Sequence, residues 1–189
     1  FVAAATPGLE TVAGQPMLTD GIATAYKDGV ERMRSSNAVS SVLSTESEGR
    51  NASPNLFEPT GATWLADHAL GEEVFGPLGL VVRVGSTEEM VDLAEKFAGQ
   101  LTATMHMDDS DLGLAQELLP VLERKAGRVL VNGFPTGVEV VDSMVHGGPY
   151  PASTNFGATS VGTMSIRRFL RPVSYQNFPE ALLPADLRN

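Results

Sequence analysis

The chain has 189 residues, 42% of them hydrophobic and 19% charged, a composition typical of a globular protein and not of a disordered one. A formal net charge of −10 without a dense basic patch argues against nucleic-acid binding, and no apolar run is long enough to cross a bilayer. The sequence contains no cysteine, which excludes disulfides, cysteine-ligated metals and a thiol nucleophile within this chain.

A helix is predicted between Asp20 and Arg34. Thr19 or Asp20 can cap its N-terminus, since each side chain can accept a hydrogen bond from the first turn. Its apolar residues fall on one face, at Ile22, Tyr26, Val30 and Met33. The preceding stretch, Ala3–Met17, is rich in Ala, Gly and Pro and predicts a helix end followed by a loop.

Extended segments are predicted to follow this helix. Val39–Thr45 alternates apolar and hydroxyl residues, which indicates a strand. Glu46–Pro54 is polar and contains Gly and Asn, so it predicts an exposed loop. The chain is expected to become extended again over Asn55–Thr63.

The stretch Leu70–Val84, LGEEVFGPLGLVVRV, holds an informative local pattern. Its apolar second half, Leu78–Val84, predicts a buried strand, and a Gly-Pro pair stops the chain just before it. The Glu73 carboxylate can accept hydrogen bonds from hydroxyls, and the Phe75 ring can pack against another ring. The alternative is that Glu73 is simply solvated and Phe75 fills the core.

Strands and helices are predicted to alternate after this point. The segments are a helix over Ser86–Phe97 that begins with a Ser86/Glu89 capping box, a strand over Leu101–Met107, a helix from Asp108 to Lys125 with Pro120 inside it, and a strand over Arg128–Asn132. This order predicts an α/β fold with a parallel-rich sheet and crossover helices.

The remainder has a different character. Gly133–Gly162 is rich in Gly, Pro, Ser and Thr, and a stretch of this length without periodicity is usually functional or disordered. Its aromatic and apolar content favours an ordered loop that lines a site. Met164–Arg171 predicts a C-terminal extended strand. We therefore expect one portion over residues 1–164 and a terminal strand with its tail over residues 165–189.

Two blocks of the chain resemble the aldehyde dehydrogenase superfamily. EEVFGP at residues 72–77 is similar to the family's Glu-apolar-Phe-Gly-Pro motif, and GRVLVN at 127–132 to its Gly-x-Val-x-Val-Asn strand. Further segments resemble the branch that oxidises alpha-ketoglutaric semialdehyde (2,5-dioxovalerate): GFPTGV at 133–138, HGGPYPAST at 146–154, RFLRPV at 168–173 and YQNFP at 175–179. The resemblance implies the C-terminal portion of the catalytic domain in that family, joined to an oligomerisation strand.

The resemblance also implies roles for particular residues. Glu73 would bond the hydroxyls of the nicotinamide ribose, and Phe75 would contact the nicotinamide end of the cofactor. Substrate-side positions are implied at Phe134, Pro135, Thr136 and His146. The alternative for His146 is a loop histidine with a structural hydrogen bond. His68 and His106 share no metal-like spacing and are expected to be structural or solvated.

The chemistry of the family needs a cysteine thiolate that attacks the aldehyde before a hydride passes to the cofactor. The resemblance implies that this cysteine and its glutamate base lie upstream of Phe1. The complete enzyme would then oxidise alpha-ketoglutaric semialdehyde to 2-oxoglutarate with NAD or NADP, and this chain alone would be inactive. It also implies a cytoplasmic homo-oligomer joined through the last strand, acting on a small-molecule aldehyde, with no nucleic-acid, membrane or metal partner.

Two alternatives remain open at this point. The first is a truncated, non-catalytic fragment or interaction module that retains only the fold. The second is a small-molecule binding domain with an unrelated ligand, an idea that rests on the long loop alone. An apolar pocket bounded by Phe134 and His146, with neither Glu73 nor Phe75 nearby, would favour the second.

Overall fold

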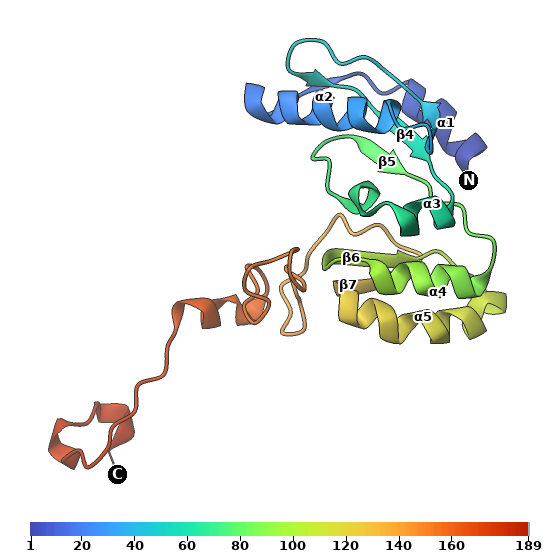
Figure 1. Ribbon diagram of the computed structural model, residues 1–189. Coiled ribbons are helices and arrows are strands. Elements are labelled where there is room, and N and C mark those ends of the chain that lie inside the picture. The colour runs from blue at the N-terminus through green and yellow to red at the C-terminus, as the bar shows by residue number, and fades with distance from the viewer. Residues whose placement is uncertain (189) are drawn as a thin grey trace. The chain divides into compact units, whose positions relative to one another are not determined.

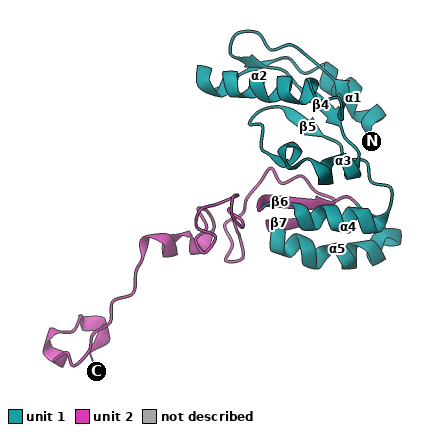
Figure 2. Ribbon diagram, in the orientation of Figure 1, with its two compact units in different colours: residues 1–98, 107–125 teal, residues 99–106, 126–189 magenta. Residues whose placement is uncertain are grey.

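The computed structural model describes residues 1–188, and the chain divides into two compact units (Figure 2). The first unit comprises residues 1–98 and 107–125, and the second comprises residues 99–106 and the chain from residue 126 onward. Helices and strands alternate along much of the sequence, and both parallel and antiparallel strand pairs occur (Figure 1). The predicted α/β class with parallel strands is confirmed.

The first unit contains most of the regular structure. Its elements are α1 (Val2–Glu10), β1 (Gln15–Pro16), α2 (Asp20–Arg34), β2 (Ser40–Leu43), β3 (Asn51–Ala52), β4 (Asn55–Glu58), α3 (Gly61–Ala66), the 3₁₀ turn η1 (His68–Gly71), β5 (Leu78–Leu80), α4 (Thr87–Lys96), η2 (Asp109–Asp111) and α5 (Leu112–Lys125). β1 pairs with β3 in an antiparallel ribbon. β4 lies at the centre of a three-stranded sheet, antiparallel to β2 and parallel to β5.

Helix α2 begins and ends where the sequence predicts. The Thr19 hydroxyl accepts a hydrogen bond from the Ile22 backbone N–H at 3.2 Å, which satisfies one of the free donors of the first turn. Asp20 lies in the first turn, and Arg32 and Arg34 lie in the last, where their charges complement the helix dipole. The buried face consists of Ala23, Tyr26, Gly29, Val30 and Met33.

Tyr26 forms the polar centre of the core of the first unit. Its hydroxyl donates to the Ser53 carbonyl at 2.6 Å, lies 3.3 Å from the Pro77 carbonyl, and accepts a hydrogen bond from the buried Asn55 amide at 3.1 Å. Burial raises the pKa of the Tyr26 hydroxyl, and the bond from Asn55 offsets part of that rise. Tyr26 thereby links α2 to the chain just before β4 and just before β5.

The two helices α4 and α5 lie side by side (Figure 1). The Ser86 hydroxyl caps α4 by accepting from the Glu89 N–H at 3.2 Å, whereas the Glu89 carboxylate accepts from the Gly85 N–H and not from Ser86. The first bond of the predicted capping box, from the Glu89 N–H to the Ser86 hydroxyl, is therefore present. In the second bond, the Glu89 carboxylate accepts from the N–H of residue 85 in place of residue 86. A reciprocal capping box precedes α5 instead, between Asp108 and Asp111.

In the second unit, β6 (Gln100–Met105) and β7 (Ala126–Val131) form a parallel pair in continuous register, from Gln100 opposite Ala126 to Met105 opposite Val131. Both strands were predicted. β5, the third predicted strand of the alternating region, pairs with β4 and is not part of the β6–β7 sheet. Its residues are half-buried, and the regular strand ends at Leu80, well short of Val84.

The predicted C-terminal strand at Met164–Arg171 is wrong. Residues Thr163–Phe169 form the 3₁₀ helix η3, with local hydrogen bonds such as Ser165 N–H to the Gly162 carbonyl at 3.1 Å. A strand needs a neighbouring strand to satisfy its backbone, and within residues 1–188 none pairs with this segment. Two further short 3₁₀ turns, η4 (Glu180–Leu182) and η5 (Ala185–Leu187), follow. Over the described chain, no helix is both long and apolar enough to span a membrane.

Candidate cofactor-binding and substrate-binding segments

Val74 anchors the segment that carries Glu73 and Phe75. Its side chain packs against the core of the first unit and lies directly over Gly29 of α2. Glu73 and Phe75, on either side of it, are exposed, and 66% of the Phe75 surface is accessible. Side chains alternate along an extended chain, so the carboxylate and the ring face away from the surface that holds Val74. The alternative in which Phe75 fills the core is wrong.

The turn after Phe75 is held by the core and by glycine. Gly76 has a φ of +149°, and a Cβ at this position would overlap the Tyr26 ring, so only glycine fits without strain. The next carbonyl, that of Pro77, accepts a hydrogen bond from the Asn55 N–H at 2.9 Å and is also within reach of the Tyr26 hydroxyl. The backbone that presents Phe75 is therefore fixed from both α2 and β4.

The two neighbouring glutamates differ in their surroundings. Glu72 pairs with Arg32 at 3.7 Å. Among the described residues no ion pair or hydrogen bond engages the Glu73 carboxylate, which is exposed to solvent. An unengaged carboxylate can accept hydrogen bonds from two hydroxyl groups, and the exposed Phe75 ring offers an apolar face close by. These two groups fit a ligand that carries a diol next to a flat ring.

The second unit places Phe134 just after the end of β7. Its ring is 79% exposed and lies against the ring of His106, which follows β6, with 5.7 Å between ring centroids. Because β6 and β7 are parallel, both rings lie at the carboxyl edge of the pair, where ligands bind in open α/β sheets. The sequence predicted only that His106 is structural or solvated, whereas the structure places it beside Phe134, one of the predicted substrate residues.

Arg128 contacts the same loop from within β7. Its guanidinium donates through Nη2 to the Pro135 carbonyl at 3.1 Å and through Nη1 to the Gly137 carbonyl. Thr136 lies between these two carbonyls. The sequence predicts Arg128 only as part of a strand, and no short motif signals such a contact.

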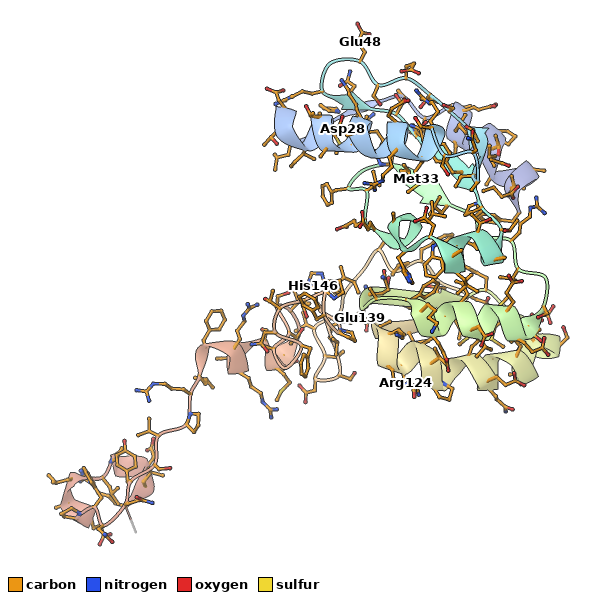
Figure 3. The ribbon with its side chains drawn as sticks, in the orientation of Figure 1. Asp28, Met33, Glu48, Arg124, Glu139 and His146 are labelled. Carbon is orange, nitrogen blue, oxygen red and sulfur yellow. The ribbon has the colours of Figure 1, made fainter. Side chains whose placement is uncertain are left out.

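His146, labelled in Figure 3, is hydrogen-bonded to a later part of its own loop. Its backbone N–H donates to the Thr159 hydroxyl at 3.0 Å, and its ring Nδ1 lies 2.9 Å from the Ser160 hydroxyl. Within residues 1–188, no hydrogen bond or ring contact joins His146 to Phe134, Pro135 or Thr136. The structure thus provides the hydrogen-bond partner that the structural alternative for this histidine requires.

Gly147 and Gly148, which follow His146, pack tightly against the first residues of β7 and β6. Gly147 and Gly148 are buried, and a Cβ on Gly148 would overlap the carbonyl oxygen of Gln100 in β6. Similarly, a Cβ on Gly127 of β7 would overlap the Gly147 carbonyl. The loop between β7 and η3 therefore reaches from the carboxyl edge of the strand pair, at Phe134, back to its amino edge.

The predicted site residues fall into two groups. Glu73 and Phe75 belong to the first unit, and the second unit holds Phe134, Pro135, Thr136 and His146. In the described chain, no group of three or more His, Asp or Glu side chains could hold a metal ion.

A shallow cleft of about 220 Å³ lies beside α2, where Lys27, Arg34 and Glu46 are among its lining residues. Arg34 already pairs with Glu46 at 3.0 Å and with Glu31 at 3.5 Å, and the Lys27 ammonium donates to the Gly49 carbonyl at 2.6 Å. None of the predicted site residues lines it. The cleft therefore gives no independent indication of a ligand.

The fold is that of aldehyde dehydrogenases. The Delta-pyrroline-5-carboxylate dehydrogenase of Mycobacterium tuberculosis superposes on 89% of this chain with a TM-score of 0.64 and 19% sequence identity, using 32% of its own length. Lactaldehyde dehydrogenase from Escherichia coli superposes on 82% of the chain with a TM-score of 0.62 and 18% identity, using 30% of its own length. About a third of each of these enzymes therefore has the same fold as this chain.

The similarities in sequence point to a narrower group of enzymes than the similarities in structure do. Alpha-ketoglutaric semialdehyde dehydrogenase 2 of Azospirillum brasilense is 49% identical over 95% of the chain, and alpha-ketoglutaric semialdehyde dehydrogenase of Acinetobacter baylyi is 45% identical over all of it. The chain spans only 36% of the length of either relative. No family model matches the sequence. The resemblance to the branch that oxidises alpha-ketoglutaric semialdehyde is confirmed.

Proposed function

We propose that the chain is part of an NAD- or NADP-dependent aldehyde dehydrogenase that oxidises alpha-ketoglutaric semialdehyde to 2-oxoglutarate. The observation that carries this proposal is 49% and 45% identity to two enzymes of that name over nearly the whole chain. Aldehyde dehydrogenases of known structure share its fold, and one of these, a pyrroline-carboxylate dehydrogenase, was solved bound with NAD.

Glu73 and Phe75 would hold the nicotinamide end of the cofactor. The Glu73 carboxylate would accept hydrogen bonds from the ribose hydroxyls, and Phe75 would pack against the nicotinamide end. Their exposure, and the absence of any competing partner for Glu73 among the described residues, supports these roles. When bound, the cofactor supplies the hydride acceptor. These residues do not discriminate NAD from NADP.

The loop after β7 would form part of the substrate site. The Phe134 ring, with His106 against it, would cover the aldehyde with an apolar surface and exclude water. Pro135 and Thr136 would line the same wall. His146 would face the substrate passage while Thr159 and Ser160 hold it in place.

The nucleophile would come from outside this chain. Oxidation of an aldehyde through a thioester needs a cysteine thiolate, and none of the 189 residues is a cysteine. The chain alone would therefore be inactive. We further propose that the enzyme is a cytoplasmic homo-oligomer. The exposed apolar side chains Ile166 and Phe169 of η3 would provide contacts to a second copy.

A chimeric enzyme tests the proposal. The matching region of the Azospirillum brasilense enzyme is replaced by this chain, and NADH or NADPH formation is followed at 340 nm. Turnover that depends on alpha-ketoglutaric semialdehyde, with no turnover by the isolated chain, is the expected result. The parent enzyme is the positive control, and the chimera with its cysteine nucleophile replaced by alanine is the negative control.

Two results would contradict the proposal. A chimera that melts cooperatively and binds NAD⁺, yet turns over other aldehydes and not this one, would refute the substrate. Aldehyde-dependent NADH formation by the isolated chain would refute the statement that its nucleophile lies elsewhere.

A further inference from the structure

We propose that Arg128 is a positioning residue that fixes the substrate loop by holding two of its carbonyl oxygens. This inference rests on the proposed function, because it takes Phe134, Pro135 and Thr136 to be the substrate wall. It assigns to Arg128 a role in aldehyde binding without direct contact with the aldehyde.

The base of the Arg128 side chain is fixed by the sheet. Arg128 lies in β7 opposite Thr102 of β6, and the same parallel register joins Gln100 to Ala126 before it and Ala103 to Val129 after it. Its backbone is therefore held by ladder hydrogen bonds. Because the backbone is fixed at this position, movement of the main chain adds little to the movement of the Arg128 side chain.

The guanidinium is suited to holding two acceptors at once. It donates through separate nitrogens to the carbonyls of Pro135 and Gly137, two residues apart. The donors of arginine lie in one plane at fixed angles, and hydrogen bonds from a charged donor are about twice as strong as neutral ones. A lysine ammonium is a compact point charge on a flexible stem, and does not reproduce this fork.

The two carbonyls that Arg128 binds, those of Pro135 and Gly137, lie next to the residues proposed to contact the substrate. Thr136 lies between them, and Phe134 immediately precedes the first. From residue 132 to residue 162 the described chain contains no helix or strand, so ladder hydrogen bonds do not hold this turn. Fixing Pro135 and Gly137 therefore limits the movement of Phe134 and Thr136, and displacements of about 1 Å at reacting groups are enough to cost about 100-fold in rate.

The first test measures loop order in the full chain of 189 residues. Steady-state {¹H}–¹⁵N NOE values are compared at Thr136, Gly137 and Val138 in the wild type, in Arg128→Met and in Arg128→Lys. The matched control is Arg124→Met, which removes an exposed arginine from the end of α5 (Figure 3). We expect strand-like values in the wild type and the control, a marked drop in Arg128→Met, and an intermediate value in Arg128→Lys. Equal values in all four proteins would overturn the proposal.

The second test uses the chimeric enzyme. Arg128→Met is expected to raise the KM for the aldehyde about tenfold or more, to change the KM for NAD⁺ less than about twofold, and to be partly rescued by lysine. A merely structural role would leave the aldehyde KM unchanged even though the loop becomes mobile, and that result would overturn the inference. If the wild-type chimera does not oxidise the aldehyde, the proposed function fails, whereas the NOE comparison still decides whether Arg128 orders the loop.

Discussion

The side chain of Val74 lies directly against Gly29 of α2, at a site where an added Cβ would overlap both of its methyl groups. The contact joins the segment that carries Glu73 and Phe75 to the most buried helix face of the first unit. It fixes the segment through its one inward side chain and leaves the two flanking side chains in solvent.

Gly29→Ala is expected to destabilise the chain. Overpacking costs about 1–3 kcal/mol, and this outweighs a gain of about 1 kcal/mol in helix propensity. Gly21→Ala in the same helix is the control, since its nearest neighbour would be at an ordinary contact distance of 3.9 Å. Urea unfolding of both variants measures the difference. Equal stability of the two variants would show that Val74 moves aside without cost.

Tyr26 gives the chain a specific sensitivity to alkaline pH. Because burial raises the pKa of its hydroxyl above 10.0, the folded state keeps a proton that the unfolded chain has lost. Its contribution to stability is thus fully present below pH 10.0 and is lost as the pH rises through the raised pKa.

Tyr26→Phe is expected to lower the free energy of unfolding by about 1 kcal/mol at about pH 8, because the hydroxyl's hydrogen bonds are lost. The same variant is expected to lose less stability than the wild type as the pH rises above 10.0, because it lacks the hydroxyl whose pKa burial raises. Tyr150→Phe, at an exposed position, is the control. Identical alkaline slopes for wild type and Tyr26→Phe would contradict the assignment.

Glu73→Gln is expected to raise the KM for the nicotinamide cofactor in the chimeric enzyme by about tenfold or more, since a hydrogen bond to a charged acceptor is replaced by a neutral one. The KM for the aldehyde should change little. Glu72→Gln is the matched control, because its exposed ion pair with Arg32 contributes little. Equal effects of the two substitutions would remove the proposed role of Glu73.

Gly148→Ala is expected to destabilise the second unit by more than about 2 kcal/mol. The added Cβ would meet the Gln100 carbonyl, which is backbone of β6 and cannot move without disturbing the strand. Gly137→Ala, whose Cβ would have no heavy atom within 4 Å, is expected to be tolerated. Thermal unfolding followed through NMR signals of β6 and β7 compares them. A Gly148→Ala variant as stable as the control would show that the loop does not pack on the strands as described.

Local signals in the sequence predicted much of the fold. The bounds of α2 follow from the cap at Thr19 and from its apolar periodicity, and β6 and β7 follow from short apolar runs between helices. Long-range pairing was harder to predict. Nothing between Leu78 and Val84 indicates that β5 pairs with β4, and the predicted strand at Met164–Arg171 lacks a partner in the described chain.

Contacts that join distant parts of the sequence had no local signal. The bonds from Arg128 to the loop and from Tyr26 to Pro77 depend on where the chain returns in space, so neither contact could be predicted from the sequence, although Tyr26 was expected on the apolar face of its helix. The motif around Glu73 was recognised through its resemblance to a family. Its anchoring through Val74 became visible only in the structure.

In the segment around Val74, the residue that holds the backbone in place differs from the residues proposed to contact the ligand. Substitutions at the two outward positions should leave the melting temperature nearly unchanged while altering what is bound, whereas changes at the inward valine or at the helix glycine should do the reverse. A lineage of such proteins could therefore vary its affinity for the bound molecule without a loss of thermal tolerance.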